Sequence, residues 1–343
     1  MGYRLAINGY GRIGRCVLRA LYESGRFPEF EVVGINDLSH IEAVAHLTRF
    51  DSTHGPFQGE VAWEDSTLLI NGHPIAVSSE KDTSRLPWGK LGVDAVMECS
   101  GAFTQRAVAE GHIRSGARKV IFSCPAGTEV DATIVYGINE QTLKNHHTII
   151  SNASCTSNCI VPVIHVLDCH LGIRHGMITT IHSMMNDQPV IDAYHNRDLR
   201  KSRSSSQSVI PVDTALPGGV DRLLPHLAGR FQAIALRVPI TNVSAMQLTV
   251  QVNNKTDVRE VNRIMKTAAE GKLAGILGYT ELPLVSCDFN HDPRSAVIDG
   301  SQTRVFGGNA LSGGTGVSVL AWFDNEWGFA NRMLDTARAL LKV

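Results

Sequence analysis

Hydrophobic positions follow two different spacings in the first part of the chain, up to Ser154. Short apolar runs, with the length of buried strands, alternate with stretches in which apolar residues recur every three to four positions. Strands that alternate with helices are typical of a parallel sheet covered by helices. The pattern predicts strands at 3–8, 31–36, 94–99, 119–122, 133–136 and 148–151. It also predicts two helices, one that ends at Gly25 and one that spans 104–115.

The pattern changes after residue 155. Strand-like alternation recurs with few helices between the strands, which is typical of an antiparallel sheet in an α+β domain. Residues 184–208 are polar and predict a long loop, and the glycine-rich residues 306–316 predict a mobile hairpin tip. The predicted strands are 177–183, 233–238, 243–252, 284–288, 296–299 and 317–323, and the predicted helices are 160–171, a segment capped by Asp257 and Glu260 that ends at Glu270, and 327–341.

These patterns predict an α/β protein of two domains. The first is a doubly wound parallel sheet of residues 1–154, and the second is an α+β domain of residues 155–324 with a mostly antiparallel sheet. The last helix is amphipathic, so we expect residues 325–343 to pack back onto the first domain and complete it.

Composition and charge narrow the class of protein. The chain has 343 residues, of which 43% are hydrophobic and 19% charged, and its net charge is −1. Such a balance gives no field that would attract nucleic acid or a membrane surface, and no apolar run reaches transmembrane length. Seven scattered cysteines favour a reducing compartment, and the strand predicted at 3–8 leaves no room for a signal peptide. We therefore expect a cytoplasmic protein that binds neither nucleic acid nor membrane.

A glycine motif follows the first predicted strand. Gly9 permits a tight turn, Gly11 lets a pyrophosphate approach the backbone, and Gly14 lets the helix pack closely against the strand. Asp37 ends the next predicted strand, about 20 residues after Gly14, where a carboxylate binds a ribose hydroxyl and repels a 2′-phosphate. A glycine-rich turn without a ligand would not explain Asp37. The motif therefore predicts a Rossmann-type fold that binds NAD rather than NADP.

Two serines follow other predicted strands. Ser100 and Ser123 come just after the strands at 94–99 and 119–122. Parallel sheets bind their ligands at these carboxyl ends, but serines are also frequent in structural turns. On the sequence alone, the two interpretations are equally favoured.

One cysteine lies where a strand passes into a helix. Cys155 follows the strand predicted at 148–151 and precedes the helical spacing of 160–171. The free N–H groups and the positive dipole end of a helix N-terminus favour an anion, so they lower the pKa of a thiol and make it nucleophilic. A small buried side chain is the other interpretation, and the position alone does not decide between the two.

The residues around Cys155 resemble the active-site signature of the phosphorylating glyceraldehyde-3-phosphate dehydrogenases, and the resemblance covers nearly the whole chain. Motifs in this order are specific, so the resemblance favours Cys155 as a nucleophile and His182 as its base over a buried cysteine and a structural histidine. The matching segments are 6–15 (AINGYGRIGR), 98–101 (ECSG), 151–159 (SNASCTSNC), 179–182 (TTIH), 237–239 (RVP) and 324–328 (DNEWG).

The resemblance implies a mechanism. Cys155 attacks the aldehyde, and His182 removes the hydroxyl proton as hydride passes to NAD. The backbone N–H of Cys155 is a further donor to the oxyanion, and phosphate or water then releases the thioacyl group. Asn325 holds the nicotinamide carboxamide, so the sulfur is expected to lie beside the nicotinamide ring as well as the imidazole. Cys159, four residues after the nucleophile, is interpreted as a packing residue.

The resemblance also implies the remaining site residues and the assembly. The family is homotetrameric, so we expect a homotetramer with residues 184–208 near a neighbouring subunit, and we expect no metal. Of the basic residues at 197–203, Arg200 alone is assigned a role. The NAD-binding positions are Gly9, Gly11, Arg12, Ile13, Gly14, Asp37, Lys81, Ser100, Ser123 and Asn325, and the substrate-site positions are Ser154, Thr156, Arg200, Asp213, Thr214 and Arg237.

Two positions depart from the glyceraldehyde-3-phosphate enzymes. Met185 stands where those enzymes usually carry Thr, and residues 212–215 read Val-Asp-Thr-Ala where they usually read Ser/Thr-Thr-Gly after Ile-Pro. Both segments resemble the bacterial D-erythrose-4-phosphate dehydrogenases, which use water to form 4-phosphoerythronate on the way to pyridoxal phosphate. We hypothesise that Met185 reshapes the far phosphate site for a longer aldose phosphate, and that the carboxylate of Asp213 disfavours inorganic phosphate.

Other interpretations stay open. A phosphorylating glyceraldehyde-3-phosphate dehydrogenase of glycolysis is the nearest alternative. A non-catalytic NAD-binding module and a nucleic-acid-binding protein belong to different classes. The intact pair of Cys155 and His182, together with the near-neutral charge, argues against these last two.

Overall fold

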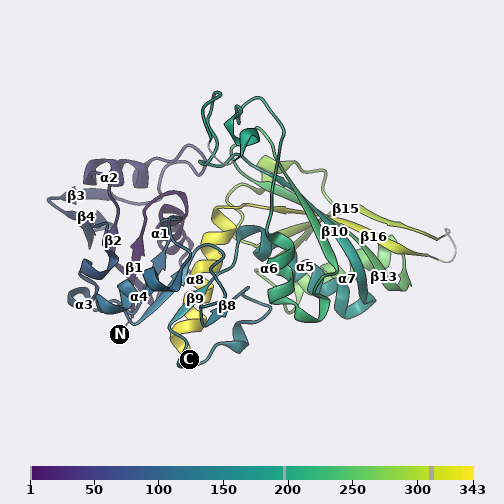
Figure 1. The fold of residues 1–343 in the computed structure, drawn as a ribbon, viewed down its shortest axis with the longest axis horizontal. Helices are drawn as coiled ribbons and strands as arrows, with labels where there is room; N and C mark the ends of the chain where they lie inside the picture. Colours follow the sequence, from purple (N-terminus) through teal and green to yellow (C-terminus); the bar gives the residue numbers. More distant parts are fainter. Residues whose placement is uncertain (1, 196–197, 309–312) are drawn as a thin grey trace. The chain divides into compact units, whose positions relative to one another are not determined.

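The computed structural model describes residues 2–195, 198–308 and 313–343, which form two compact units (Figure 1). Residues 2–154 form the first unit together with Phe329–Val343, and Cys155–Gly328 form the second. Residues 325–328, which the sequence pattern assigns to the first domain, therefore fall in the second unit. Arg197 and residues 309–312, parts of the predicted loop and hairpin, lie outside the described residues.

A largely parallel sheet is the centre of the first unit. Its order among the described residues is β3-β4-β5-β2-β1-β6-β7-β9-β8, and the strands from β5 to β8 pair in parallel, whereas β3 and β4 pair antiparallel. The predicted doubly wound sheet is confirmed. The strands are β1 (Tyr3–Asn8), β2 (Phe30–Asn36), β3 (Val61–Glu64), β4 (Thr67–Ile70), β5 (His73–Ser78), β6 (Ala95–Glu98), β7 (Lys119–Phe122), β8 (Ala132–Thr133) and β9 (Ile149–Ser151).

The helices of this unit include the last helix of the chain. The apolar stripe of α8 is buried. Two hydrogen bonds join the helix to the rest of the unit: Thr336 Oγ1 donates to Asn152 Oδ1 at 2.6 Å, and Lys119 Nζ donates to the Leu340 carbonyl at 2.9 Å. Residues 329–343 of this helix belong to the first unit. The helices are α1 (Arg12–Ser24), which ends at a left-handed Gly25, α2 (Ile41–Arg49), α3 (Trp88–Leu91), α4 (Arg106–Arg114), α8 (Trp327–Lys342) and the 3₁₀ turns η1 (Thr83–Arg85) and η2 (Glu140–Thr142).

The strand predicted at 133–136 is wrong beyond its first residue. The β8 strand ends at Thr133 because Asn139 takes over the next backbone groups. Its Oδ1 accepts the N–H of Val135 at 2.8 Å, and its Nδ2 donates to the Thr133 carbonyl at 2.9 Å. These bonds bend the chain into a turn, as asparagine side chains do when they compete with a ladder.

A mixed, mostly antiparallel sheet is the centre of the second unit, as predicted. Its order among the described residues is β11-β12-β10-β13-β16-β15-β14, with parallel pairing only at β10–β12 and β14–β15. The strands are β10 (Ile173–His182), β11 (Ile210–Val212), β12 (Phe231–Arg237), β13 (Ser244–Thr256), β14 (Leu277–Thr280), β15 (Ala296–Phe306) and β16 (Gly314–Phe323).

Helices pack on this second sheet. The α5 helix contacts β13, and α7 contacts β14 and β15. As predicted, Asp257 caps α7: its Oδ1 accepts the N–H of Glu260 at 2.9 Å. The helices are α5 (Cys155–Leu171), α6 (Leu216–Leu223) and α7 (Val258–Glu270), with the 3₁₀ turns η3 (Leu199–Ser202), η4 (Pro225–Leu227) and η5 (Ser286–Phe289). In the part of the chain that the structure describes, we find no helix with the length and apolarity needed to cross a membrane.

The strand predicted at 284–288 is wrong, because the chain forms the η5 turn there. Asp288 Oδ2 accepts the N–H of Val285 at 2.8 Å, and the N–H of Asp288 donates to the Val285 carbonyl at 3.0 Å. A side chain that bonds three residues back closes a turn and cannot lie in an extended ladder. The predicted hairpin is present, with β15 antiparallel to β16.

Candidate active site

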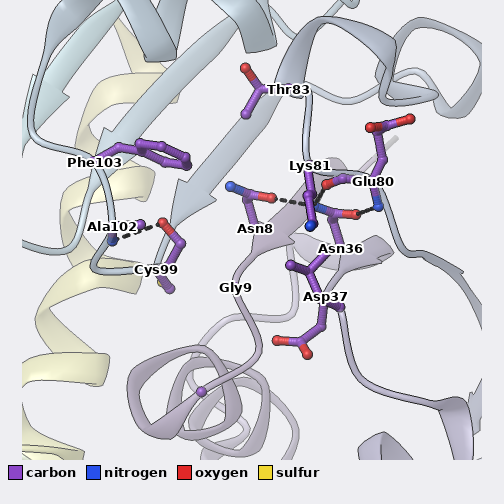
Figure 2. A pocket seen from close by; sticks show the side chains of 13 residues that line it. Asn8, Gly9, Asn36, Asp37, Glu80, Lys81, Thr83, Cys99, Ala102 and Phe103 are labelled. Atoms are coloured by element: carbon purple, nitrogen blue, oxygen red, sulfur yellow. Dashed lines mark hydrogen bonds between the residues drawn. The ribbon is translucent and has the colours of Figure 1, made fainter.

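A cavity of about 500 Å³ opens at the carboxyl ends of β1, β2 and β6 in the first unit (Figure 2). In a parallel sheet this edge is where ligands bind. Polar groups from several elements point into the cavity, and they include three of the predicted NAD-binding positions beside the glycines. The cavity is lined by Asn8, Gly9, Gly11, Asn36, Asp37, Leu38, Glu80, Lys81, Thr83, Cys99, Ser100, Ala102 and Phe103.

The three glycines of the motif have different surroundings. Gly9 has a φ of 85°, and a Cβ there would overlap the backbone of Ser100. A Cβ at Gly14 would overlap the Gly9 carbonyl oxygen, so the helix and the strand need glycine to pack closely. Gly11 precedes α1 and has open space where its Cβ would be. That space at a helix N-terminus fits the pyrophosphate of a dinucleotide.

Asp37 lies at the cavity with its carboxylate held in place (Figure 2). Its Oδ2 accepts the N–H of Tyr10 at 2.8 Å, and its Oδ1 accepts the N–H of Ser39 at 2.9 Å. A carboxylate with a fixed orientation can bind a ribose diol and repels a 2′-phosphate. Lys81 and Ser100 also line the cavity.

Five of the predicted NAD-binding residues do not line the cavity, namely Arg12, Ile13, Gly14, Ser123 and Asn325. Arg12 directs its guanidinium to Asp51, with Nη1 and Oδ2 2.5 Å apart. Ile13 follows it in α1, and neither is a lining residue. Ser123 donates its N–H to the Glu98 carbonyl at 3.0 Å, as a residue of the strand edge does.

Cys155 begins α5 after a tight turn. Ala153 has a left-handed φ of 56°, and its N–H donates to Ser151 Oγ at 3.0 Å, while that hydroxyl donates to the Cys124 carbonyl at 2.7 Å. A non-glycine residue in this conformation carries strain, which is common at functional sites. The turn places the sulfur at the first helical position, as the sequence pattern predicts.

His182 ends β10 and faces the cysteine. Its Nε2 lies 3.9 Å from Cys155 Sγ, and its Nδ1 lies 2.8 Å from the carbonyl oxygen of Ser183. Because a carbonyl only accepts, Nδ1 carries the hydrogen, and the free lone pair on Nε2 faces the thiol. This tautomer is the one that a general base at Cys155 requires.

The ionisation of this pair differs from the expectation for a helix N-terminus. Burial raises the pKa of the Cys155 thiol to about 11, although the N–H groups of Thr156 and Cys155 lower it. Burial likewise lowers the pKa of His182, and the Ser183 carbonyl opposes this only in part. The predicted lowering of the thiol pKa is therefore wrong for the isolated thiol, because desolvation outweighs the helix start. We therefore expect formation of a thiolate at neutral pH to depend on the imidazole that lies beside the sulfur.

Arg237 ends β12 with its guanidinium already paired. Both Nη atoms bond to the carboxylate of Asp187, and Nη1 also donates to Gln188 Oε1 at 2.9 Å. Asp187 also pairs with Lys201, with Nζ and Oδ2 3.0 Å apart. These bonds fix the orientation of an arginine whose side chain is 10% exposed.

Asn325 is held by two buried hydroxyls. Ser183 Oγ and Ser244 Oγ each donate to Asn325 Oδ1 at 2.9 Å, and the N–H of Ser183 donates to Ser244 Oγ at 3.1 Å. Because Oδ1 accepts both hydroxyls, the amide presents its Nδ2 as a donor. The same Ser183 supplies the carbonyl that orients His182, so one residue links the base to the amide.

The other predicted substrate residues are less closely tied to this cluster. Arg200 is exposed in η3, where its N–H donates to Asp198 Oδ1. Asp213 is exposed, and Thr214 Oγ1 accepts the N–H of Leu216 at 3.2 Å at the start of α6. Ser154 and Thr156 flank Cys155 in the chain.

Four residues at these sites were given no role by the sequence pattern: Asp187, Ser183, Ser244 and Glu98. The first three are single polar residues whose partners are distant in sequence or defined only by the fold. Glu98 carried a signal, because a charged residue ends a strand that is otherwise apolar (Ala95-Val96-Met97). A charge in such a strand is unusual and calls for partners.

Two protein-family models match the chain. Residues 154–325 match the C-terminal domain of glyceraldehyde 3-phosphate dehydrogenase, and residues 3–106 match the NAD-binding domain of that enzyme. The second segment contains the whole lining of the cavity, and the first contains Cys155, His182, Arg237 and Asn325. The prediction that the cofactor is NAD is confirmed.

Proposed function

Because the chain belongs to the glyceraldehyde-3-phosphate dehydrogenase family of NAD-dependent dehydrogenases, we propose that it oxidises D-erythrose 4-phosphate to 4-phosphoerythronate, with water as the acyl acceptor. The observation that carries the choice of substrate is the pair of departures at Met185 and Asp213. This reaction supplies an intermediate of pyridoxal phosphate synthesis. The proposed location is the cytoplasm, which the seven free cysteines favour.

The residues of the second unit support each chemical step. The Cys155 sulfur adds to C1 of the aldehyde, and its proton passes to His182 Nε2, which lies 3.9 Å away. His182 returns this proton to the aldehyde oxygen, which gives a hemithioacetal with a free hydroxyl. The neutral imidazole then removes the hydroxyl proton, and the carbonyl re-forms as C1 loses hydride, for which bound NAD would be the acceptor. After the imidazolium has released its proton to solvent, His182 takes a proton from a water that adds to the thioester, and the Cys155 sulfur leaves and takes up that proton as the thiol.

The departures at Met185 and Asp213 are proposed to set the substrate and the acyl acceptor. Met185 is 45% exposed and offers a thioether where a threonine would offer a hydroxyl, so a phosphate finds no hydrogen-bond donor in that side chain. Asp213 is an exposed carboxylate directly before Thr214, and its charge repels inorganic phosphate. Together they favour a longer aldose phosphate and hydrolysis over phosphorolysis.

We propose that the active form is a homotetramer in which the loop at 184–208 meets a second copy of the chain. Several large apolar side chains on this loop are exposed, namely Val190 (70%), Ile191 (75%), Tyr194 (104%) and Leu199 (82%). Such a series in contact with water is typical of an interaction surface. Light scattering of the purified protein measures the mass, and a monomer at micromolar concentration would contradict this assembly.

Turnover of the two aldehydes decides the substrate. We expect D-erythrose 4-phosphate to be oxidised with a kcat/KM about tenfold or more above that for glyceraldehyde 3-phosphate, without a requirement for inorganic phosphate. Met185→Thr and Asp213→Thr are matched variants that should increase use of the three-carbon aldehyde and of phosphate, respectively. A wild-type preference for glyceraldehyde 3-phosphate plus phosphate would instead show the glycolytic activity.

A cysteine variant separates an enzyme from a binding module. Cys155→Ser should abolish oxidation of both aldehydes while its dissociation constant for NAD stays within about twofold of wild type. Wild-type protein that binds NAD but oxidises neither aldehyde would show that the chain is a non-catalytic NAD-binding module.

A further inference from the structure

The floor of the NAD cavity is a chain of side-chain hydrogen bonds across the ends of three strands. Figure 2 shows Asn8, Asn36 and Glu80 linked by dashed bonds. Asn36 Nδ2 donates to Asn8 Oδ1 at 2.7 Å and to the Glu80 carbonyl at 2.9 Å, and Asn36 Oδ1 accepts the N–H of Glu80 at 2.9 Å. All three residues line the cavity, so their orientations determine which donors and acceptors a ligand meets.

Glu98 lies at the other end of this chain, behind the lining. Its carboxylate is 1% exposed and accepts four hydrogen bonds. Oε1 accepts the N–H of Ser100 at 2.9 Å and the hydroxyl of Ser100 at 2.5 Å, and Oε2 accepts Asn8 Nδ2 at 2.5 Å and His112 Nε2 at 3.0 Å. Burial works to raise the pKa of Glu98, but the bonds from His112, Ser100 and Asn8 outweigh it and leave the pKa below its ordinary value.

The imidazole behind Glu98 has a fixed tautomer. Trp88 Nε1 donates to His112 Nδ1 at 2.9 Å, and both residues are fully buried. Because an indole nitrogen only donates, Nδ1 accepts, and the ring hydrogen is on Nε2, directed at Glu98. His112 is therefore a neutral donor, and the four groups that hold this carboxylate are an amide, a hydroxyl, a backbone N–H and a neutral imidazole.

The ionised carboxylate at one end of the floor and the backbone of Glu80 at the other determine the direction of every bond between them. A carboxylate only accepts, so Asn8 must direct Nδ2 to Glu98 and Oδ1 to Asn36. Asn36 must then direct Nδ2 to Asn8, which leaves its Oδ1 for the N–H of Glu80. The backbone groups of Glu80 cannot exchange roles, so the far end of the chain is fixed as well. Neither amide can flip without placing two donors, or two acceptors, in contact.

We propose that Glu98 is a positioning residue for NAD: its carboxylate fixes the orientations of Asn8 and Ser100 at the wall of the cavity and, together with the Glu80 backbone, supports that of Asn36. A neutral amide in its place disrupts one end of the network. If the NH₂ group of the amide faces Asn8 and His112, it meets two hydrogen-bond donors. If the NH₂ group faces Ser100 instead, it meets the backbone N–H of that residue, which is also a donor. The proposal rests on NAD binding by the first unit and is independent of which aldehyde is oxidised.

The test is the affinity of a near-isosteric variant for the dinucleotide, measured by titration calorimetry. Glu98→Gln should weaken binding of NAD, and of ADP-ribose, by about tenfold, the effect of losing roughly one buried hydrogen bond. Trp88→Phe is the matched control, because it removes the donor to His112 on the side away from the cavity. It should lower the melting temperature while the dissociation constant for NAD stays within about twofold of wild type.

A second variant shows whether Glu98 acts through the floor. Asn8→Ala cuts the link between Glu98 and Asn36 and should weaken NAD binding by a similar factor. The double variant Glu98→Gln/Asn8→Ala should weaken binding by less than the product of the two single effects, because both act on one network. If Glu98→Gln does not fold, Asn8→Ala alone gives the decision.

Any of three results overturns the proposal. The first is a dissociation constant for NAD that is unchanged from wild type in the folded Glu98→Gln variant. If Glu98→Gln does not fold, the same result in Asn8→Ala has this meaning. The second is a loss of affinity in Trp88→Phe as large as that in Glu98→Gln, which would mean general destabilisation. The third is a loss of NAD affinity in the double variant that equals the product of the losses in the two single variants.

Discussion

If Cys155 and His182 ionise as a pair, the variant His182→Asn should lose most of the reactivity of the Cys155 thiol. Asparagine keeps a polar side chain at the end of β10 but cannot become a cation. Burial raises the pKa of the Cys155 thiol to about 11, so without an imidazolium the thiolate is scarce at neutral pH. We therefore expect the variant to retain its thiol and to lose most of its reactivity.

The distance between the two groups gives the size of the effect. With Sγ and Nε2 3.9 Å apart, the attraction between thiolate and imidazolium is 332/(20 × 3.9), or about 4 kcal/mol at an effective dielectric constant of about 20. That corresponds to a factor of about 10³ in thiolate population. Because burial lowers the pKa of His182, forming the imidazolium offsets part of this gain. We expect alkylation at pH 7 to fall by about 10²-fold.

Alkylation with iodoacetamide, followed by peptide mass spectrometry, measures this rate at Cys155 separately from the other cysteines. In the wild type the proton moves within the pair, so the rate should change little across neutral pH. In His182→Asn the rate should climb about tenfold per pH unit toward the thiol pKa. The exposed Cys169 is the internal control, and its rate should be the same in both proteins.

Two outcomes would refute this reasoning. One is a variant rate at pH 7 within about threefold of wild type, which would mean that the helix N-terminus alone stabilises the thiolate. The other is a wild-type rate that rises steeply from neutral pH, which would mean that Cys155 ionises without its neighbour.

Two further predictions concern the stability of the first unit. Gly9→Ala places a Cβ against the backbone of Ser100 at a φ of 85°, so it should lower the free energy of unfolding by about 3 kcal/mol in a denaturant titration; a loss below about 1 kcal/mol would contradict that close approach. Burial acts to raise the pKa of Asp51, but the Arg12 hydrogen bond and two backbone N–H donors outweigh it and lower this pKa from 3.8 to about 2. Asp51→Asn should therefore cost about 2 kcal/mol at pH 7, and the difference from wild type should disappear as the pH falls from about 4 through 2; a difference that persists at pH 2 would exclude the ion pair as its cause.

Several local features of the fold could be predicted from the sequence because each depends on a few adjacent residues. Gly9 follows from the tight turn after β1, Gly14 follows from the contact between that strand and the next helix, and Gly25 follows from the need to end α1 in a left-handed conformation. The position of Cys155 at the start of α5 follows from the change of spacing around it. The spacing of apolar residues shows where such helices and strands begin and end.

The antiparallel part of the first sheet could not be predicted in the same way. The strands β3, β4 and β5 are four to six residues long. The turns that join them contain Asp65 and Asn71, and Pro74 lies within β5 itself. Four residues are too few to show a period. Their pairing is decided by β2, whose edge accepts β5 in parallel.

The ionic properties of the site also depend on the fold. The sequence shows that Cys155 is near a helix N-terminus, which lowers a thiol pKa, but it does not show how deeply the sulfur is buried, which raises it. Similarly, Asp187 and Arg237 are 50 residues apart, and the chain sequence gives no sign that they bond. The resemblance to a family supplied His182, and the fold supplied the Ser183 carbonyl that sets its tautomer.

The first unit is built from two stretches of chain that are separated in the sequence by the whole of the second unit, and this has a consequence for its synthesis. The ribosome releases residues 2–154 first and α8 last, so the surface that Met333, Leu334 and Leu340 cover stays exposed until the rest of the chain has been added. At about 5–20 residues per second that interval is roughly 10–40 s. The inserted unit is thus synthesised in full before the unit that surrounds it in sequence, and the nascent nucleotide-binding unit lacks one of its helices until α8 has been made.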